Sequence, residues 1–78
     1  MSRSGFLRAI EEILGVPPRS LREDDTRETI SQWTSLADVQ IFSLITSELG
    51  IEPDASLIEA ESIGDLLGVL AGRRAFGG

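Results

Sequence analysis

The side chains that could carry chemistry in this chain of 78 residues are limited to hydroxyls, carboxylates, amides and guanidinium groups. The sequence contains no cysteine, histidine or lysine. These absences exclude Ser–His and Cys–His nucleophilic pairs, Schiff-base chemistry, a phosphate-binding P-loop lysine, disulfides and zinc sites built on Cys or His. The carboxylate pairs Glu11-Glu12 and Asp24-Asp25 lie in solvated-looking segments, and no EF-hand pattern is present. We therefore expect neither enzymatic activity nor a metal site.

One serine stands at a chemically useful position. Ser35 comes where an irregular segment ending in Trp33 and Thr34 changes into a strongly apolar helix. Serine is among the best N-cap residues, and Ser35-x-x-Asp38 resembles a capping box, so a cap is the simplest interpretation. Thr34 can also cap, which would free the Ser35 hydroxyl to face solvent. Because a helix N-terminus favours a phosphate diester, a serine that carries a phosphate-linked group would also suit this position.

Two of the elements that must position this serine are predicted by helical spacing of apolar residues. The first helix is expected from about Gly5 to Leu14, with Ser4 as its cap and Gly15 as its end. The second is expected from Leu36 to Leu49 and ends at Gly50. Its apolar residues cover a broad arc, wide enough to be gripped on two sides.

The connection between these helices, residues 16–34, is long for so small a domain, which suggests a functional or packing role. Leu21 and Ile30 are its isolated apolar residues, and we expect them to pin the loop to the core. A short helical turn is predicted near Thr26 to Ser31.

A short and a closing helix follow the second helix. The short one is expected at residues 57–58 with Ser56 as its cap. The closing helix opens at Ser62, which forms a capping-box-like pair with Asp65. Gly64 and Gly68 weaken it by about 1 kcal/mol each relative to alanine. Close approach of a neighbouring helix would be one reason to tolerate them.

No stretch shows strand alternation with hairpin turns, so the predicted fold is all-α: a small four-helix bundle of three main helices and one short helix. Residues 1–78 are expected to form one domain, with an ordered bundle at about 4–71 and a flexible tail at 72–78. A monomer is the default expectation.

The charge of the chain bears on its partners. The formal net charge is -6, from 13 acidic and 7 basic residues. An acidic chain repels phosphate backbones, so nucleic-acid binding is not expected; the charge either favours basic patches on protein partners or keeps the protein in solution. No apolar run is long enough to span a bilayer and no secretory signal pattern is present, so we expect a cytoplasmic protein.

The ordered set of motifs resembles acyl carrier proteins. Trp33-Thr34-Ser35-Leu36 and the apolar pattern after it are similar to the second helix of that family, which opens with Asp-Ser-Leu. The resemblance covers nearly the whole chain. The stretches that carry it are residues 10–16, 25–33, 33–36, 39–42, 45–51 and 61–70.

This resemblance implies a four-helix bundle of acyl-carrier-protein type and a non-catalytic function. A phosphopantetheinyl transferase would attach 4′-phosphopantetheine from coenzyme A to Ser35. The arm's thiol would then hold acyl groups as thioesters for acyl-loading and acyl-processing enzymes of a lipid or secondary-metabolite pathway, such as fatty acid or polyketide biosynthesis. The bundle would sequester or release the acyl chain between helices. A prosthetic group that brings its own sulfur fits a chain without cysteine.

The sequence also departs from the family pattern along the second helix. Thr34 replaces the family's Asp before the serine, and Gln40 replaces a Glu. The expected partner is therefore specific to a specialised carrier and recognises an apolar or mixed surface rather than a strongly acidic one. The residues expected to contact partners are Thr34, Leu36, Asp38, Val39, Phe42 and Glu48.

Two alternatives stay open at this point. An unmodified helical interaction module with the carrier fold is the first, and Thr34 is its main support. The second is a ubiquitin-like modifier, because residues 77–78 are Gly-Gly. Ubiquitin-like proteins are β-grasp folds, and the lack of predicted hairpins argues against this interpretation.

Overall fold

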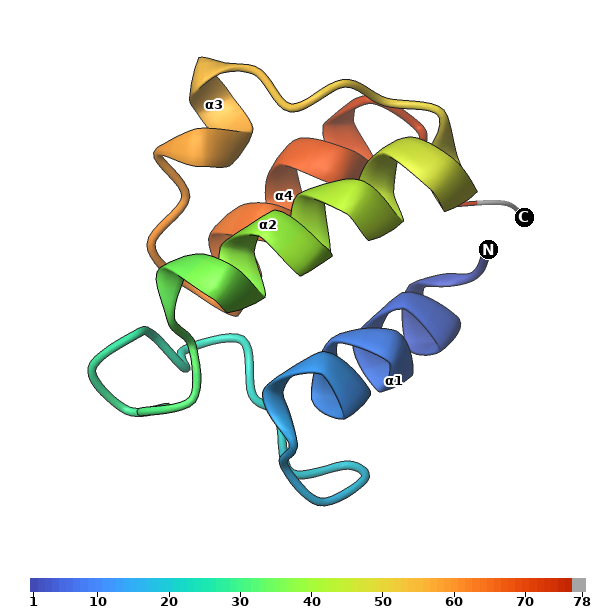
Figure 1. Cartoon of the computed structure of the whole chain (residues 1–78). Coiled ribbons are helices and arrows are strands. Elements are labelled where there is room, and N and C mark those ends of the chain that lie inside the picture. The colour runs from blue at the N-terminus through green and yellow to red at the C-terminus, as the bar shows by residue number, and fades with distance from the viewer. Residues whose placement is uncertain (77–78) are drawn as a thin grey trace.

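The computed structural model describes residues 1–76, and every regular element in this part of the chain is helical (Figure 1). The Cα radius of gyration is 11.3 Å, close to the value of about 11.5 Å expected for a folded chain of this length. The prediction of a small all-α fold with three longer helices and one short helix is confirmed. The elements are α1 (Arg3–Leu14), α2 (Ser35–Leu44), the wide turn η1 (Ile45–Leu49), α3 (Ala55–Ile58) and α4 (Ile63–Gly72).

The start of α1 differs from the prediction, whereas its end does not. Ser2, not Ser4, is the N-cap: its hydroxyl accepts a hydrogen bond from the amide of Gly5 at 3.0 Å. Both serines have the right chemistry, so sequence alone could not separate them. The helix ends as predicted at Gly15, whose φ of 70° is the left-handed conformation that glycine adopts at low cost.

The predicted second helix is divided into α2 and η1. α2 keeps the α-helical pattern to Leu44, and Ile45–Leu49 form a π-helical turn that ends, as predicted, at Gly50. The hydroxyl of Ser47 donates to the carbonyl oxygen of Leu44 at 3.3 Å. Such side-chain bonds compete with the backbone ladder and favour local widening of a helix.

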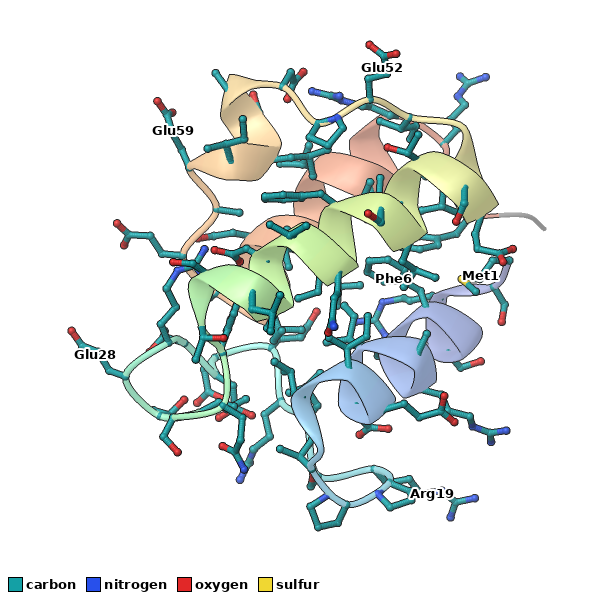
Figure 2. The ribbon with its side chains drawn as sticks, viewed as in Figure 1. Met1, Phe6, Arg19, Glu28, Glu52 and Glu59 are labelled. Carbon is teal, nitrogen blue, oxygen red and sulfur yellow. The ribbon has the colours of Figure 1, made fainter. Side chains whose placement is uncertain are left out.

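The core lies where the inner faces of α1, α2 and α4 meet, with α3 and the first loop closing its ends. Figure 2 shows the Phe6 side chain directed inward, whereas Arg19 and Glu59 project away from the body of the molecule. The prediction that helically spaced apolar residues of α1 and α4 contribute to the core is confirmed. The fully buried large side chains are Phe6, Ile10, Ile41, Ile45, Leu57, Ile63 and Leu70.

The expectation that α2 is gripped on two sides holds for only part of its apolar arc, in which Phe42 and Leu44 pack partly buried against the core. Ala37, Ile41 and Ile45 are buried along one face. The side chains of Leu36 and Val39 remain 68% and 61% exposed. The broad apolar arc thus exceeds what the neighbouring helices cover, and part of it is left at the surface.

The first loop packs against α4. Ile30 is buried and Leu21 packs partly buried against the core, so the prediction that they anchor the loop is confirmed. The short helical turn predicted near Thr26 to Ser31 is present as a single turn, in which the carbonyl oxygen of Thr26 accepts from the amides of Thr29 and Ile30. Thr26 also forms an isolated antiparallel bridge with Ser62, just before α4.

The caps of the two last helices follow the prediction in one case only. Ser62 caps α4 by accepting from the amide of Asp65 at 3.0 Å, as expected. The cap of α3 is Asp54, which accepts from the amide of Leu57 at 3.2 Å, and not Ser56. Asp54 has the extended backbone that an N-cap requires, whereas Ser56 already lies inside the helix.

The first residues of the expected tail at 72–78 make contacts with the bundle. α4 continues to Gly72, and Arg73 pairs with Asp54 at the start of α3. The ring of Phe76 packs against that of Phe6, with 5.5 Å between centroids. Residues 72–76 therefore lie against the bundle, whereas the Gly-Gly pair at 77–78 lies outside the described residues. Within residues 1–76, no helix combines the length and apolar character that a membrane span needs.

Candidate functional site

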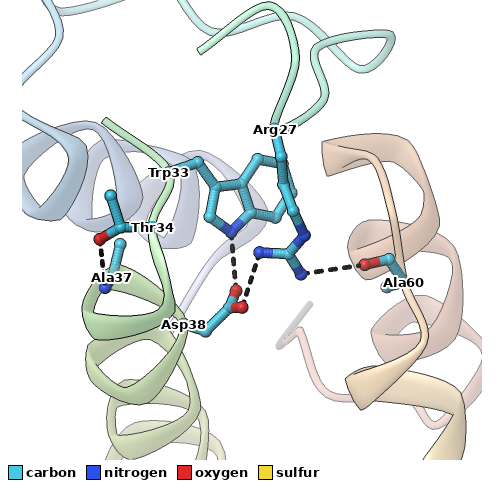
Figure 3. Close-up of polar contacts among 6 residues, drawn as sticks. All are labelled: Arg27, Trp33, Thr34, Ala37, Asp38 and Ala60. Carbon is cyan, nitrogen blue, oxygen red and sulfur yellow. Dashed lines mark hydrogen bonds and ion pairs between the residues drawn. The ribbon is translucent and has the colours of Figure 1, made fainter. Parts of the chain in front are cut away.

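Ser35 is the first residue of α2, and Thr34 is its N-cap. The Thr34 side-chain oxygen accepts a hydrogen bond from the amide of Ala37 at 3.3 Å (Figure 3). Ser35 is exposed, and its hydroxyl makes no hydrogen bond within residues 1–76. Of the two capping residues that the sequence allowed, Thr34 is the one used. The Ser35 hydroxyl is therefore available for chemistry.

The backbone around Ser35 suits an anion. The amide of Asp38 donates to the Thr34 carbonyl oxygen at 3.0 Å, and the Ala37 amide is bound to the cap. The amides of Ser35 and Leu36 have no partner among the described residues. Free amides and the helix dipole both favour negative charge at this end of α2.

Asp38, which the sequence placed in a capping box with Ser35, is held by other partners. Its carboxylate accepts a hydrogen bond from the indole nitrogen of Trp33 at 2.7 Å and pairs with Arg27 at 2.6 Å (Figure 3). Because Thr34 supplies the cap, the Asp38 side chain is free to turn toward the first loop. Its charge is thus compensated within the protein, beside a serine that faces solvent.

Arg27 is a residue of this region that sequence reasoning missed. Besides its ion pair with Asp38, its guanidinium lies 4.7 Å from the centroid of the Trp33 ring. It also donates to the carbonyl oxygen of Ala60 at 3.4 Å. No periodic pattern links Arg27 to residues 11 and 33 positions away, so its contacts depend on the tertiary fold.

The solvent-facing side of α2 is apolar near Ser35 and becomes polar further along. Phe42 is half-buried and lines a shallow groove of about 450 Å³ with Val39 and Pro53. A second shallow groove of about 650 Å³ separates α1 from α2 and includes Ile13 and Leu44. Val39, Ser43 and Ser47 line both grooves and so form the ridge between them.

The structure leaves most of the predicted partner-contacting residues exposed along α2 and η1. Thr34, Leu36 and Val39 are exposed at the start and middle of α2, and Glu48 is exposed in η1. Asp38 and Phe42 are half-buried, and Asp38 is engaged by Trp33 and Arg27. The exposed residues nearest to Ser35 are therefore uncharged.

These residues fit a phosphate-linked prosthetic group. Ser35 offers an unbonded hydroxyl, the adjacent amides are free, and the nearest carboxylate, on Asp38, is neutralised by Arg27. Residues 1–76 contain no group of three or more acidic side chains placed to hold a metal ion. Comparison of the chain with protein-family models, curated proteins and solved structures returned no match.

Proposed function

We propose that this protein is an acyl carrier in which Ser35 bears 4′-phosphopantetheine. The observation that supports the proposal is the use of Thr34 as the helix cap, which leaves the Ser35 hydroxyl exposed and unbonded at the head of α2. When bound, the group would supply a terminal thiol that holds acyl chains as thioesters, chemistry that a chain without cysteine cannot provide itself.

The residues of the chain would then have separate tasks. Ser35 supplies the ester oxygen, and the free amides at the start of α2 favour the phosphate charge. Leu36 and Val39, 68% and 61% exposed, offer apolar contacts to the transferase and to acyl-processing enzymes. Because Asp38 is internally paired, the surface next to Ser35 attracts partners through apolar contact more than through charge.

These features favour a specialised carrier over a general fatty-acid-synthesis carrier. The protein would work as a cytoplasmic monomer in a lipid or secondary-metabolite pathway, with each partner enzyme docking over the start of α2. The type of fold is proposed as that of acyl carrier proteins, since four helical segments and a long first loop leading to the serine are what such a carrier requires.

The intact mass of the protein after incubation with coenzyme A, Mg²⁺ and a promiscuous phosphopantetheinyl transferase tests the proposal. The wild type is expected to gain the mass of one phosphopantetheinyl group. Ser35→Ala is expected to gain nothing. Ser43→Ala, which changes another exposed serine of α2, should be modified like the wild type. A folded wild type without added mass, or added mass on Ser35→Ala, would refute the proposal.

A second candidate is an unmodified helical interaction module. The exposure of Leu36 and Val39 favours it, because an apolar docking surface does not require a prosthetic group. The mass of the protein from its native host separates the two functions. An unmodified protein that co-purifies with one partner, and loses it on Leu36→Asp substitution, would favour the module over the carrier.

A further inference from the structure

We propose that Trp33, Asp38 and Arg27 form a polar staple that positions Ser35 for modification. This inference rests on the carrier function proposed above. Trp33 and Asp38 are joined by a hydrogen bond of 2.7 Å, and Arg27 contacts both. None of the three is assigned a chemical step: they are positioning residues for the serine hydroxyl.

The geometry corresponds to a known way of fixing a helix start. With Thr34 as N-cap, Trp33 is the residue before the cap and Asp38 is the fourth residue of the helix. Residues at these two positions often make an apolar contact, the hydrophobic staple, which fixes the angle at which the chain enters the helix. Here an indole N–H and a carboxylate take that place. Ser35 lies between the two members.

The partial burial of these polar contacts strengthens their hold on the orientation of Asp38. Trp33 is only 4% exposed, and the Asp38 side chain is 23% exposed. The Asp38 carboxylate uses one oxygen for the indole and the other for Arg27. Removal of Arg27 would leave a carboxylate with a single neutral donor in a half-buried place, which disfavours the observed orientation of Asp38.

Arg27 also joins the staple to distant segments. It comes from the first loop, its guanidinium lies over the Trp33 ring, and it donates to the Ala60 carbonyl oxygen in the connection between α3 and α4 (Figure 3). Thr34, Ser35 and Leu36 are exposed, so the described part of the chain does not cover them from outside. The direction of the Ser35 hydroxyl therefore depends on the staple beneath it.

Steady-state kinetics of the transferase give the first test. In Arg27→Met, kcat is expected to fall about tenfold with little change in KM, because the serine is misoriented while the exposed docking residues remain. Arg27→Lys, which keeps the charge, should recover part of the loss. Arg3→Met is the matched control, since it removes a different loop ion pair, Arg3–Glu23 at 2.8 Å, from the far end of α1. Unchanged kcat in Arg27→Met, or an equal loss in Arg3→Met, would overturn the inference.

Amide hydrogen exchange in the unmodified protein gives a second test that does not need the transferase. Arg27→Met is expected to speed exchange at Ala37 and Asp38 about tenfold while Ile41 and Ile45 keep their protection. Exchange that is unchanged, or that rises equally throughout α2 and α4, would contradict a local staple. If the wild type is never modified, the carrier function fails and the exchange experiment still decides whether the staple exists.

Discussion

The backbone amide of Gly64 donates a 2.8 Å hydrogen bond to the carbonyl oxygen of Glu23, so the first loop lies directly on the first turn of α4. A Cβ atom at Gly64 would lie 3.0 Å from that same oxygen. At Gly68, one turn further along, a Cβ atom would meet nothing within 4 Å. The expected close neighbour of these glycines is thus the loop, not a helix, and it explains Gly64 alone.

Alanine substitutions should separate the two glycines. Gly68→Ala is expected to raise the free energy of unfolding by about 1 kcal/mol, because alanine is the better helix former and has room. Gly64→Ala should not raise the free energy of unfolding in this way, since the Glu23 backbone would have to move to make room for the methyl group. Urea unfolding followed by circular dichroism measures both values. Equal gains in the two variants would show that the loop yields without cost.

Substitution of Thr34 and of Ser35 by alanine should have different effects on the free energy of unfolding. Thr34→Ala removes the cap and is expected to lower the free energy of unfolding by about 1 kcal/mol. Ser35→Ala removes a hydroxyl that bonds to nothing in residues 1–76, so its stability should match the wild type. Thermal and urea unfolding of the two variants provide the comparison. A larger loss for Ser35→Ala would mean that Ser35 is the cap and is not free to be modified.

The division of α2 and η1 into a buried and an exposed face predicts that truncating a buried side chain costs more stability than truncating an exposed one. Ile45 is fully buried, so Ile45→Ala is expected to lower the free energy of unfolding by about 2–5 kcal/mol. Val39 is exposed, so Val39→Ala is expected to lower the free energy of unfolding by less than about 0.5 kcal/mol. Urea midpoints with an unchanged m-value would verify the difference. A costly Val39→Ala would indicate that this ridge is covered in solution.

The stability contributed by Asp54, the cap of α3, should depend on pH. The Arg73 guanidinium bound to Asp54 lowers the pKa of that carboxyl below the usual 3.8, and the amide of Leu57 adds to the effect. A carboxyl whose pKa is lower in the folded than in the unfolded state stabilises the protein at any pH above its unfolded-state pKa. This stabilisation is lost as the pH falls from about 3.8 through the folded-state pKa. A carboxyl NMR titration should give a midpoint below 3.8 for Asp54 that moves upward in Arg73→Met. An unchanged midpoint in that variant would show that Arg73 is not the cause.

Much of the fold follows from local pattern. Apolar spacing places α1, α2 and α4, and Gly15 and Gly50 mark ends that the structure keeps. Cap assignments are less certain, because Ser2 and Ser4 have the same chemistry and only the position of the first turn selects between them. The packing of Phe76 on Phe6 joins the two ends of the described chain, and no local sequence pattern predicts such a contact.

The candidate site, too, is only partly predictable from the sequence. The sequence identifies Ser35 and the apolar residues beside it, because they lie together on one helix. It does not decide between Thr34 and Ser35 as the cap, since both are good capping residues in adjacent positions. The pairing of Asp38 with Arg27 depends on how the first loop folds back over Trp33. Attachment of a prosthetic group to Ser35 remains a prediction.

The position of Trp33 has a practical consequence. It is the single tryptophan of a chain that has no tyrosine, so its intrinsic fluorescence can be excited selectively. The indole is buried next to a guanidinium and bound to a carboxylate, two residues before Ser35. Its emission therefore reports on the start of α2 in the unlabelled protein. The proposed loading of Ser35, the proposed docking of a partner and local opening of this turn can therefore be tested by fluorescence without a dye.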